Sequence, residues 1–249
     1  MATRVIDITR SPTLPRRVDK HWKTRSNINK IILHCTDRDW TIDELYEYDV
    51  LGEVNGEINR IDSNGLPGIT YVEVFMKDGL QYHCNDWEDW IWHAAGHNQH
   101  TLGAAIMYKA TADHYSLPNR EPPAAAVDAF ISWAARSCLY LGLDPYKAVQ
   151  GHRELKGTGW FFDKKGHKQL RKVCPGLRID MNNIRLRVAI YAQKFLYLKA
   201  KNYNGLLDLR QTITEFADGI WGPKTRTLAK ALYKRRELLL EAKHGGLLT

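Results

Sequence analysis

The first two thirds of the chain alternate between short apolar runs and helical patterns. The run Asn29-Lys-Ile-Ile-Leu-His-Cys is apolar and β-branched, and it predicts a buried strand that ends in the polar stretch 36–39. A strand, a turn and a second strand are predicted over 69–84, because Asp78-Gly79 is a strong hairpin signal between two apolar runs. Residues 103–108 predict a further strand.

Two helical patterns accompany these strands. Thr41 and Glu44 have the spacing of a capping box, which marks the start of a short helix. Apolar residues then recur at helical spacing from 127 to 141, and Gly142 with Pro145 ends that helix. Strands that alternate with helices favour an α/β fold, which we expect to be a mixed central sheet flanked by helices.

After residue 180 the pattern is helical throughout. Apolar residues at helical spacing form two stripes, at Ile184, Val188, Tyr191, Phe195 and Leu198 and at Leu228, Leu232 and Leu239. They predict a small all-helical bundle. We therefore expect three parts: an N-terminal arm at 1–27, an α/β domain at 28–180 and a helical domain at 181–249.

Charge separates the same two regions. The 249 residues include 36 Lys and Arg against 28 Asp and Glu, a formal net charge of +8. Residues 1–175 carry 22 basic and 22 acidic side chains, whereas 176–249 carry 14 and 6, so the whole excess lies in the last part. A basic module favours an anionic partner, such as nucleic acid, a membrane surface or an acidic polymer.

The N-terminal residues lack the apolar core of a secretory signal peptide, so we expect no export by that route. The longest apolar-rich stretch, 124–143, contains Asp128 and Arg136, which argues against stable insertion in a membrane. Four cysteines at irregular spacing do not form the pattern of a disulfide framework.

Three residues are candidates for a metal site. His34 ends the predicted buried strand, His152 follows an apolar pair, and Cys174 precedes a proline. A catalytic zinc site needs three protein ligands and an open position, and two imidazoles with one thiolate meet that need. Taken one by one, residues of these types are more often buried histidines and an inert core cysteine than metal ligands.

Five motifs, taken together, are more specific. Ile31-Ile-Leu-His-Cys-Thr, Ile69-Thr-Tyr, Trp92-His-Ala-Ala-Gly-His-Asn, Gly151-His-Arg-Glu and Lys172-Val-Cys-Pro follow one another along the chain. In this order they resemble zinc-dependent N-acetylmuramoyl-L-alanine amidases of the phage endolysin type, which share a fold with peptidoglycan-recognition proteins. The resemblance covers residues 28–180. It implies cleavage of the amide bond between N-acetylmuramic acid and L-alanine in peptidoglycan.

The resemblance also assigns roles to residues. It implies that a zinc ion is the cofactor and that its ligands are His34, His152 and Cys174. It implies that Tyr71 and Lys172 are catalytic, and that His93 and Asn98 line the substrate groove. Donors near the scissile carbonyl would stabilise its oxyanion. Tyr71, Lys172 and a zinc-bound hydroxyl all remain candidates for passing a proton to the leaving amine.

Two segments depart from the shortest members of that family. Glu154 stands where the family usually has aspartate, and 155–171 is a longer excursion that we interpret as a hairpin or lid with a turn at 163–166. Near the C-terminus, Asp218-Gly-Ile-Trp-Gly-Pro-Lys-Thr resembles the core motif of a small three-helix peptidoglycan-binding domain. An enzyme motif and a wall-binding motif in one chain indicate a common substrate.

We therefore expect peptidoglycan as the partner and a monomeric protein. The basic residues of the C-terminal module, among them Arg185, Arg187 and Lys194, are interpreted as a solvated face that also attracts anionic envelope polymers. An endolysin would be made in the host cytoplasm and act at the cell wall, in the periplasm, after release. Two alternatives remain: a non-catalytic recognition module, which usually lacks the cysteine ligand, and a nucleic-acid-binding protein, for which we find no motif.

Overall fold

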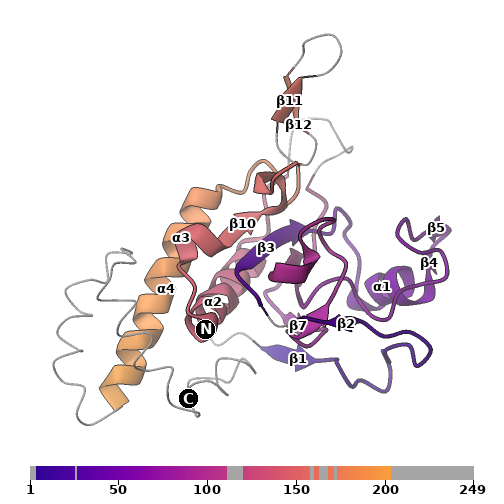
Figure 1. Cartoon of the computed structure of the whole chain (residues 1–249), viewed down its shortest axis with the longest axis horizontal. Helices are drawn as coiled ribbons and strands as arrows, with labels where there is room; N and C mark the ends of the chain where they lie inside the picture. The colour runs from indigo at the N-terminus through magenta and orange to yellow at the C-terminus, as the bar shows by residue number, and fades with distance from the viewer. Residues whose placement is uncertain are drawn as a thin grey trace. The chain divides into compact units, whose positions relative to one another are not determined.

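A computed structural model describes residues 4–25, 27–110, 120–157, 160–162, 168–170 and 173–202 (Figure 1). The chain divides into two compact units. We call Thr3–Val127 with Gln150–Ile179 the sheet unit, and Asp128–Val149 with Asp180–Thr249, which also includes Met1–Ala2, the helical unit.

The sheet unit is built around a mixed sheet of six strands in the order β1-β7-β6-β9-β3-β10. Neighbours β1 and β7, β6 and β9, and β3 and β9 run parallel, whereas β6 and β7 are antiparallel. The predicted α/β class with a mixed central sheet is therefore confirmed. The six strands are β1 (Val5–Asp7), β3 (Lys30–Cys35), β6 (Glu73–Phe75), β7 (Gln81–His83), β9 (Thr101–Ile106) and β10 (Val149–Gly151).

Shorter elements connect these strands. They are β2 (Lys23–Thr24), α1 (Ile42–Tyr46), the π-helix η1 (Glu47–Leu51), β4 (Glu53–Val54), β5 (Glu57–Ile58), β8 (Asp89–Trp90), and the 3₁₀ turns η2 (Asn98–His100) and η3 (His152–Glu154). The predicted capping box is present, because the Glu44 N–H donates to Thr41 Oγ1 over 3.2 Å and the Thr41 N–H to Glu44 Oε2 over 2.8 Å. The predicted short helix is thus confirmed, and the chain continues from it into η1.

Strand β3 forms the centre of the core. It pairs with β9 along its whole length, from Lys30 opposite Thr101 to Cys35 opposite Ile106. Ile31, Ile32 and Leu33 are fully buried. Consecutive buried residues require cover on both faces of the sheet, which explains why this strand is an unbroken apolar run and not an alternating pattern.

The predicted hairpin over 69–84 is present, with a first strand shorter than expected. Gly79, at the tip, has φ of +87°, a left-handed conformation that favours glycine. Strand β6 starts only at Glu73, because the side chain of buried Asn85 donates to the carbonyls of Ile69 and Tyr71 over 2.6 and 2.7 Å. A side chain therefore satisfies backbone groups that a strand partner would otherwise bind.

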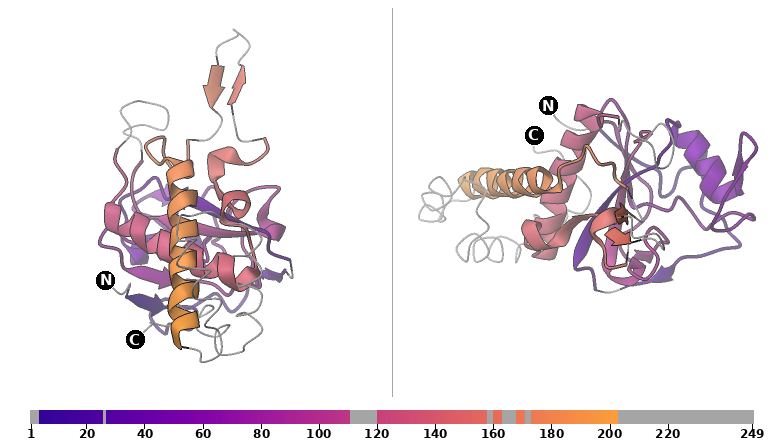
Figure 2. Two further views of the ribbon diagram at one scale, coloured as in Figure 1. Left: turned by 90° about the vertical axis from the view of Figure 1, so that its left-hand side faces the viewer. Right: turned by 90° about the horizontal axis from the view of Figure 1, so that it is seen from above.

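In the helical unit, α2 (Ala124–Leu141, starting in the sheet unit), α3 (Pro145–Ala148) and α4 (Met181–Asn202) are helices. Figure 2 shows α4 as one long, continuous helix. The Arg187 guanidinium of α4 pairs with Asp128 of α2, and Arg185 donates to the carbonyl of Val149 over 3.2 Å. Helix α4 thus belongs to the same compact unit as 128–149.

Several predictions for the C-terminal part fall outside the described residues. Residues 203–249 include the Asp218 motif and the second apolar stripe, so the helical bundle at 181–249 stays a prediction. The excursion after Glu154 contains an antiparallel pair, β11 (Trp160–Phe162) and β12 (Lys168–Leu170), which confirms the hairpin interpretation. Among the helices of the described segments, none has the length and apolar character needed to cross a membrane.

A buried ion pair joins the two strands of the hairpin. His83 Nδ1 lies 2.6 Å from Glu73 Oε1, and the Glu73 side chain is only 3% exposed. Burial by itself lowers the pKa of His83, but the hydrogen bond and charge of Glu73 outweigh burial, so the pKa lies above its ordinary value of 6.5. A pKa raised by folding contributes stability at low pH, and this contribution is lost as the pH rises through the folded-state pKa.

We expect His83→Gln to lower the free energy of unfolding by about 1.5–3 kcal/mol at pH 5.5, the range for a hydrogen bond to a charged group. The loss should be smaller at pH 9, because this contribution is lost as the pH rises through the folded-state pKa of His83. Urea unfolding of both proteins at both pH values measures this difference, with exposed His100→Gln as the control. An equal loss at both pH values would show that the charge of His83 contributes nothing.

Candidate metal centre and active site

The sheet order brings the two candidate histidines together. His34 lies near the end of β3, and His152 follows directly after β10, the strand next to β3. Their ring centroids are 4.5 Å apart. Glu154 accepts a hydrogen bond from the Gly151 N–H over 2.9 Å and so closes the turn that carries His152.

Cys174 completes the cluster from a distant part of the chain. Its carbonyl accepts a hydrogen bond from the Arg153 N–H over 2.9 Å, which anchors it beside the turn that carries His152. One ligand atom from each of His34, His152 and Cys174 lies within 4.8 Å of the others. The structure thus brings together the three residues predicted as zinc ligands.

The spacing and chemistry of these atoms fit a zinc ion. His34 Nδ1 lies 3.6 Å from Cys174 Sγ. Zinc bound tetrahedrally at its usual distances to nitrogen and sulfur would place those two ligand atoms about 3.5 Å apart. Two imidazoles and a thiolate also leave one of four positions open, which is the arrangement of a catalytic and not a structural zinc site.

The surroundings favour the thiolate form of Cys174. Burial by itself raises the pKa of this thiol, but a hydrogen bond with Cys35 and the imidazoles of His34 and His152 outweigh burial and hold the pKa well below its ordinary 9.0. The backbone N–H of Cys35 also donates to Sγ over 3.3 Å. Because thiolates are the metal-binding form of cysteine, the sulfur is prepared to act as a ligand.

Tyr71 lies next to His34, with ring centroids 5.4 Å apart. The Asn85 side chain donates a hydrogen bond to the backbone carbonyl of Tyr71. Burial raises the pKa of Tyr71 well above its ordinary 10, so the side chain stays a neutral phenol that can donate a hydrogen bond. Lys172, the second residue predicted as catalytic, lies outside the described residues.

His93 and Asn98, predicted to line a substrate groove, both make internal contacts. His93 is 9% exposed, and its Nδ1 lies 3.0 Å from Nε2 of His34. Asn98 Oδ1 accepts a hydrogen bond from the Ala94 N–H over 2.6 Å, which fixes the turn after His93. Sequence analysis missed this contact between two histidines, although Gly103 in the interior of a strand is a known signal of close approach by another group.

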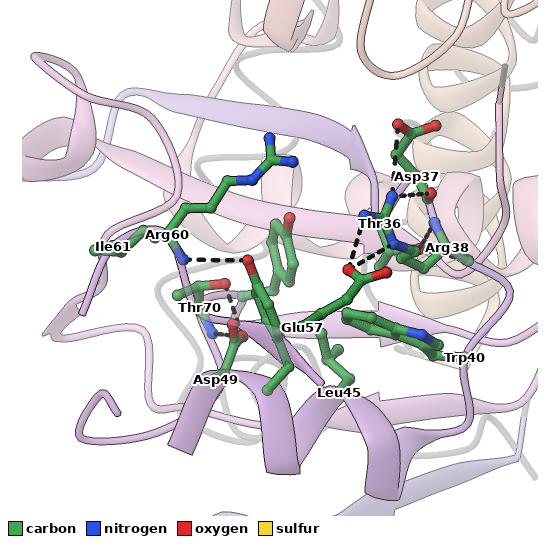
Figure 3. A pocket seen from close by; sticks show the side chains of 12 residues that line it. Thr36, Asp37, Arg38, Trp40, Leu45, Asp49, Glu57, Arg60, Ile61 and Thr70 are labelled. Carbon is green, nitrogen blue, oxygen red and sulfur yellow. Dashed lines mark hydrogen bonds and ion pairs between the residues drawn. The ribbon is translucent and has the colours of Figure 1, made fainter. Parts of the chain in front are cut away.

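A pocket of about 180 Å³ lies beside Tyr71 (Figure 3). The Arg38 side chain pairs with Glu57 over 2.8 Å at its edge. Asp49 is buried, and burial raises its pKa to about 6 although the N–H and hydroxyl of Thr70 both donate to it. The pocket is lined by Thr36, Asp37, Arg38, Trp40, Leu45, Tyr48, Asp49, Glu57, Arg60, Ile61, Thr70 and Tyr71.

Comparison with known families agrees with this geometry. The profile of a family described as N-acetylmuramoyl-L-alanine amidase matches residues 24–177, more than half of the chain. The chain belongs to this amidase family. The match includes His34, His152 and Cys174. A comparison with curated protein sequences finds no match.

Solved structures show the same fold. Peptidoglycan recognition protein SD of Drosophila superposes with a TM-score of 0.51 at 12% identity, over 71% of this chain and 90% of that protein. The amidase LysC from Clostridium intestinale gives a TM-score of 0.46 at 19% identity, over 74% and 97%. Drosophila PGRP-LB gives 0.48 at 17% identity, over 71% and 89%. The family match, together with the superposition on protein SD, confirms the predicted fold, which amidases share with peptidoglycan-recognition proteins.

We expect the purified amidase to bind one zinc ion per chain and Cys174→Ala to lose most of that binding, because only two protein ligands remain. Metal analysis after dialysis against a weak chelator measures the stoichiometry. Cys84→Ala is the matched control, since Cys84 is a buried cysteine of the apolar core. Full zinc occupancy in Cys174→Ala would exclude the sulfur as a ligand.

Proposed function

We propose that the chain is a zinc-dependent hydrolase that cleaves the amide bond between N-acetylmuramic acid and L-alanine in peptidoglycan. The observation that carries this proposal is the convergence of His34, His152 and Cys174, with the Tyr71 ring beside them. A recognition module without activity would have no need of a thiolate at the third position, so the cluster favours an enzyme.

In this proposal zinc, when bound, polarises the scissile carbonyl and lowers the pKa of water to about 7. His34, His152 and Cys174 would hold the ion, and the Cys35 N–H, which donates to Cys174 Sγ, would orient the thiolate. The Tyr71 phenol donates a hydrogen bond to the carbonyl oxygen as negative charge develops there. Lys172 is proposed as a second donor, on the strength of the motif around Cys174.

The pocket beside Tyr71 adds a place for substrate. It has an aromatic wall of Trp40 and Tyr48 and charged groups at Arg38 and Glu57. Such a mixed lining suits a peptide with both apolar and charged groups. We propose that the stem peptide binds there, with its first amide bond directed at the zinc ligands.

We further propose that the chain is an endolysin that acts on the bacterial cell wall in phage lysis, and that 181–249 is a module that binds peptidoglycan. The first proposal rests on the order of the five motifs, and the second on the Asp218 motif and the basic excess after residue 175. We infer that wall polymers, and not nucleic acid, are the anionic partner of this module.

Purified peptidoglycan tests the reaction. We expect wild type to release new N-terminal L-alanine, and chelator-treated and Cys174→Ser proteins to release almost none. Tyr71→Phe should lower kcat by about 100- to 1,000-fold, the usual cost of removing one oxyanion donor. Tyr82→Phe, a partly buried tyrosine of β7, is the matched control. Reducing sugar ends in place of new amines would instead identify a glycosidase.

Sedimentation with cell walls tests the module. We expect deletion of 203–249 to weaken wall binding more than it slows turnover of small soluble fragments. The cut keeps α4, because Arg185 and Arg187 tie that helix to the rest of its unit. Added salt should weaken binding by the full chain, since screening reduces attraction between exposed charges. Equal sedimentation of both proteins would exclude 203–249 as the wall-binding segment.

A further inference from the structure

Behind the candidate metal centre, His34 is the first member of a continuous series of hydrogen bonds. His34 Nε2 lies 3.0 Å from His93 Nδ1, and His93 Nε2 lies 3.0 Å from Thr101 Oγ1. The Thr101 hydroxyl in turn donates to the carbonyl of His97 over 2.9 Å. His34, His93 and Thr101 are all buried. This series lies on the side of His34 that faces away from Cys174.

Only one direction of donation satisfies every member of the series. His34 Nδ1 faces Cys174 Sγ at 3.6 Å, so a metal on that side needs the Nδ1 lone pair and leaves the proton on Nε2. His93 Nδ1 must then accept, which leaves its own proton on Nε2 to be donated to Thr101. The Thr101 hydroxyl can accept this bond and still donate to the carbonyl of His97.

The backbone is shaped to receive the ring of His93. A Cβ atom at Gly103, on β9, would lie 2.4 Å from Cγ of His93, so any larger residue would push the ring away.

A buried arginine fixes the segment that carries His93. Arg25 is 6% exposed, and its guanidinium donates to the carbonyls of Trp87 over 2.7 Å and Asn98 over 3.1 Å and also to that of Thr101. Trp87 precedes His93 in the sequence, whereas Asn98 and Thr101 follow it. The segment is therefore held at both of its ends, and the position of the His93 ring relative to β3 is set by several bonds.

We propose that His93 is a positioning residue that accepts a hydrogen bond from the Nε2–H of His34. This bond fixes the tautomer and the ring orientation that present His34 Nδ1 to the metal. This inference rests on the proposed zinc function and adds to it a residue that acts through a ligand. Partners of this kind typically change metal affinity or activity by about 10- to 100-fold. His93 thus acts on the metal and not on the substrate.

Two nearly isosteric substitutions separate the hydrogen bond from packing. Asparagine at position 93 places an oxygen acceptor close to where Nδ1 stood, whereas leucine has the same branching and no acceptor. We expect His93→Leu to raise the zinc dissociation constant, measured by chelator competition, by about 10- to 100-fold, and His93→Asn by less than about threefold. The cobalt-substituted His93→Leu protein should show altered ligand-field bands and a lower kcat at nearly unchanged KM.

Unfolding midpoints of the metal-free proteins show whether each variant keeps its fold. Thr101→Val and Thr101→Ser form a second, milder pair, in which only valine removes the hydroxyl that His93 binds. Thr101→Val should weaken zinc binding relative to Thr101→Ser. If His93→Leu does not fold, the comparison of Thr101→Val with Thr101→Ser tests the inference in its place.

Four outcomes would overturn the inference. Equal zinc affinities in His93→Leu and His93→Asn would mean that packing and not hydrogen bonding matters. A raised KM with wild-type zinc affinity and an unchanged cobalt spectrum would place His93 against the substrate. Wild-type protein that binds no zinc would defeat the proposed function, and this inference would fall with it. If wild type binds zinc and His93→Leu binds it equally well, this inference is wrong and the proposed function still stands.

Discussion

The site depends above all on the parallel pairing of β3 with β9. This pairing runs in register from Lys30 to Cys35, and it places His34 opposite Ala105 at a fully buried position. The end of β3 then supplies two groups in succession: the imidazole of His34 and the backbone N–H that Cys35 donates to the sulfur of Cys174. Because side chains alternate along a strand, a shift of one residue would turn His34 away and misplace that N–H at the same time.

Much of this arrangement could be predicted from sequence, where local signals are strong. The apolar run at 29–35, the Asp78-Gly79 turn and the Thr41 capping box each depend on contacts between near neighbours, and all three are confirmed. The prediction of a strand over 69–72 was wrong, because the side chain of Asn85, more than ten residues away, donates hydrogen bonds to the carbonyls of Ile69 and Tyr71. Propensity describes local preference and does not include such distant partners.

The gathering of His34, His152 and Cys174 could be predicted only by resemblance. His34 and His152 are more than 100 residues apart, and His152 and Cys174 about 20, and such separations carry no geometric information by themselves. The two histidines come together because β3 and β10 are neighbours in the sheet. The contact of His93 with His34 was missed for a related reason. A histidine in a motif suggests contact with substrate, whereas burial and a glycine opposite the ring are properties of the folded chain.

Charged side chains have different partners in the sheet unit and on α4. In the sheet unit, several partly exposed charges are paired across short distances, as in Arg38 with Glu57 and Arg16 with Asp89. This pairing agrees with the equal numbers of basic and acidic residues in 1–175. On α4, by contrast, Arg187 pairs with Asp128 and Arg185 binds a backbone carbonyl, so part of the basic stripe serves helix packing. A solvated face was therefore an incomplete interpretation of these residues. Because Arg185 and Arg187 are already bound within the fold, they have less to offer an anionic polymer than an exposed lysine of the same helix, such as Lys194.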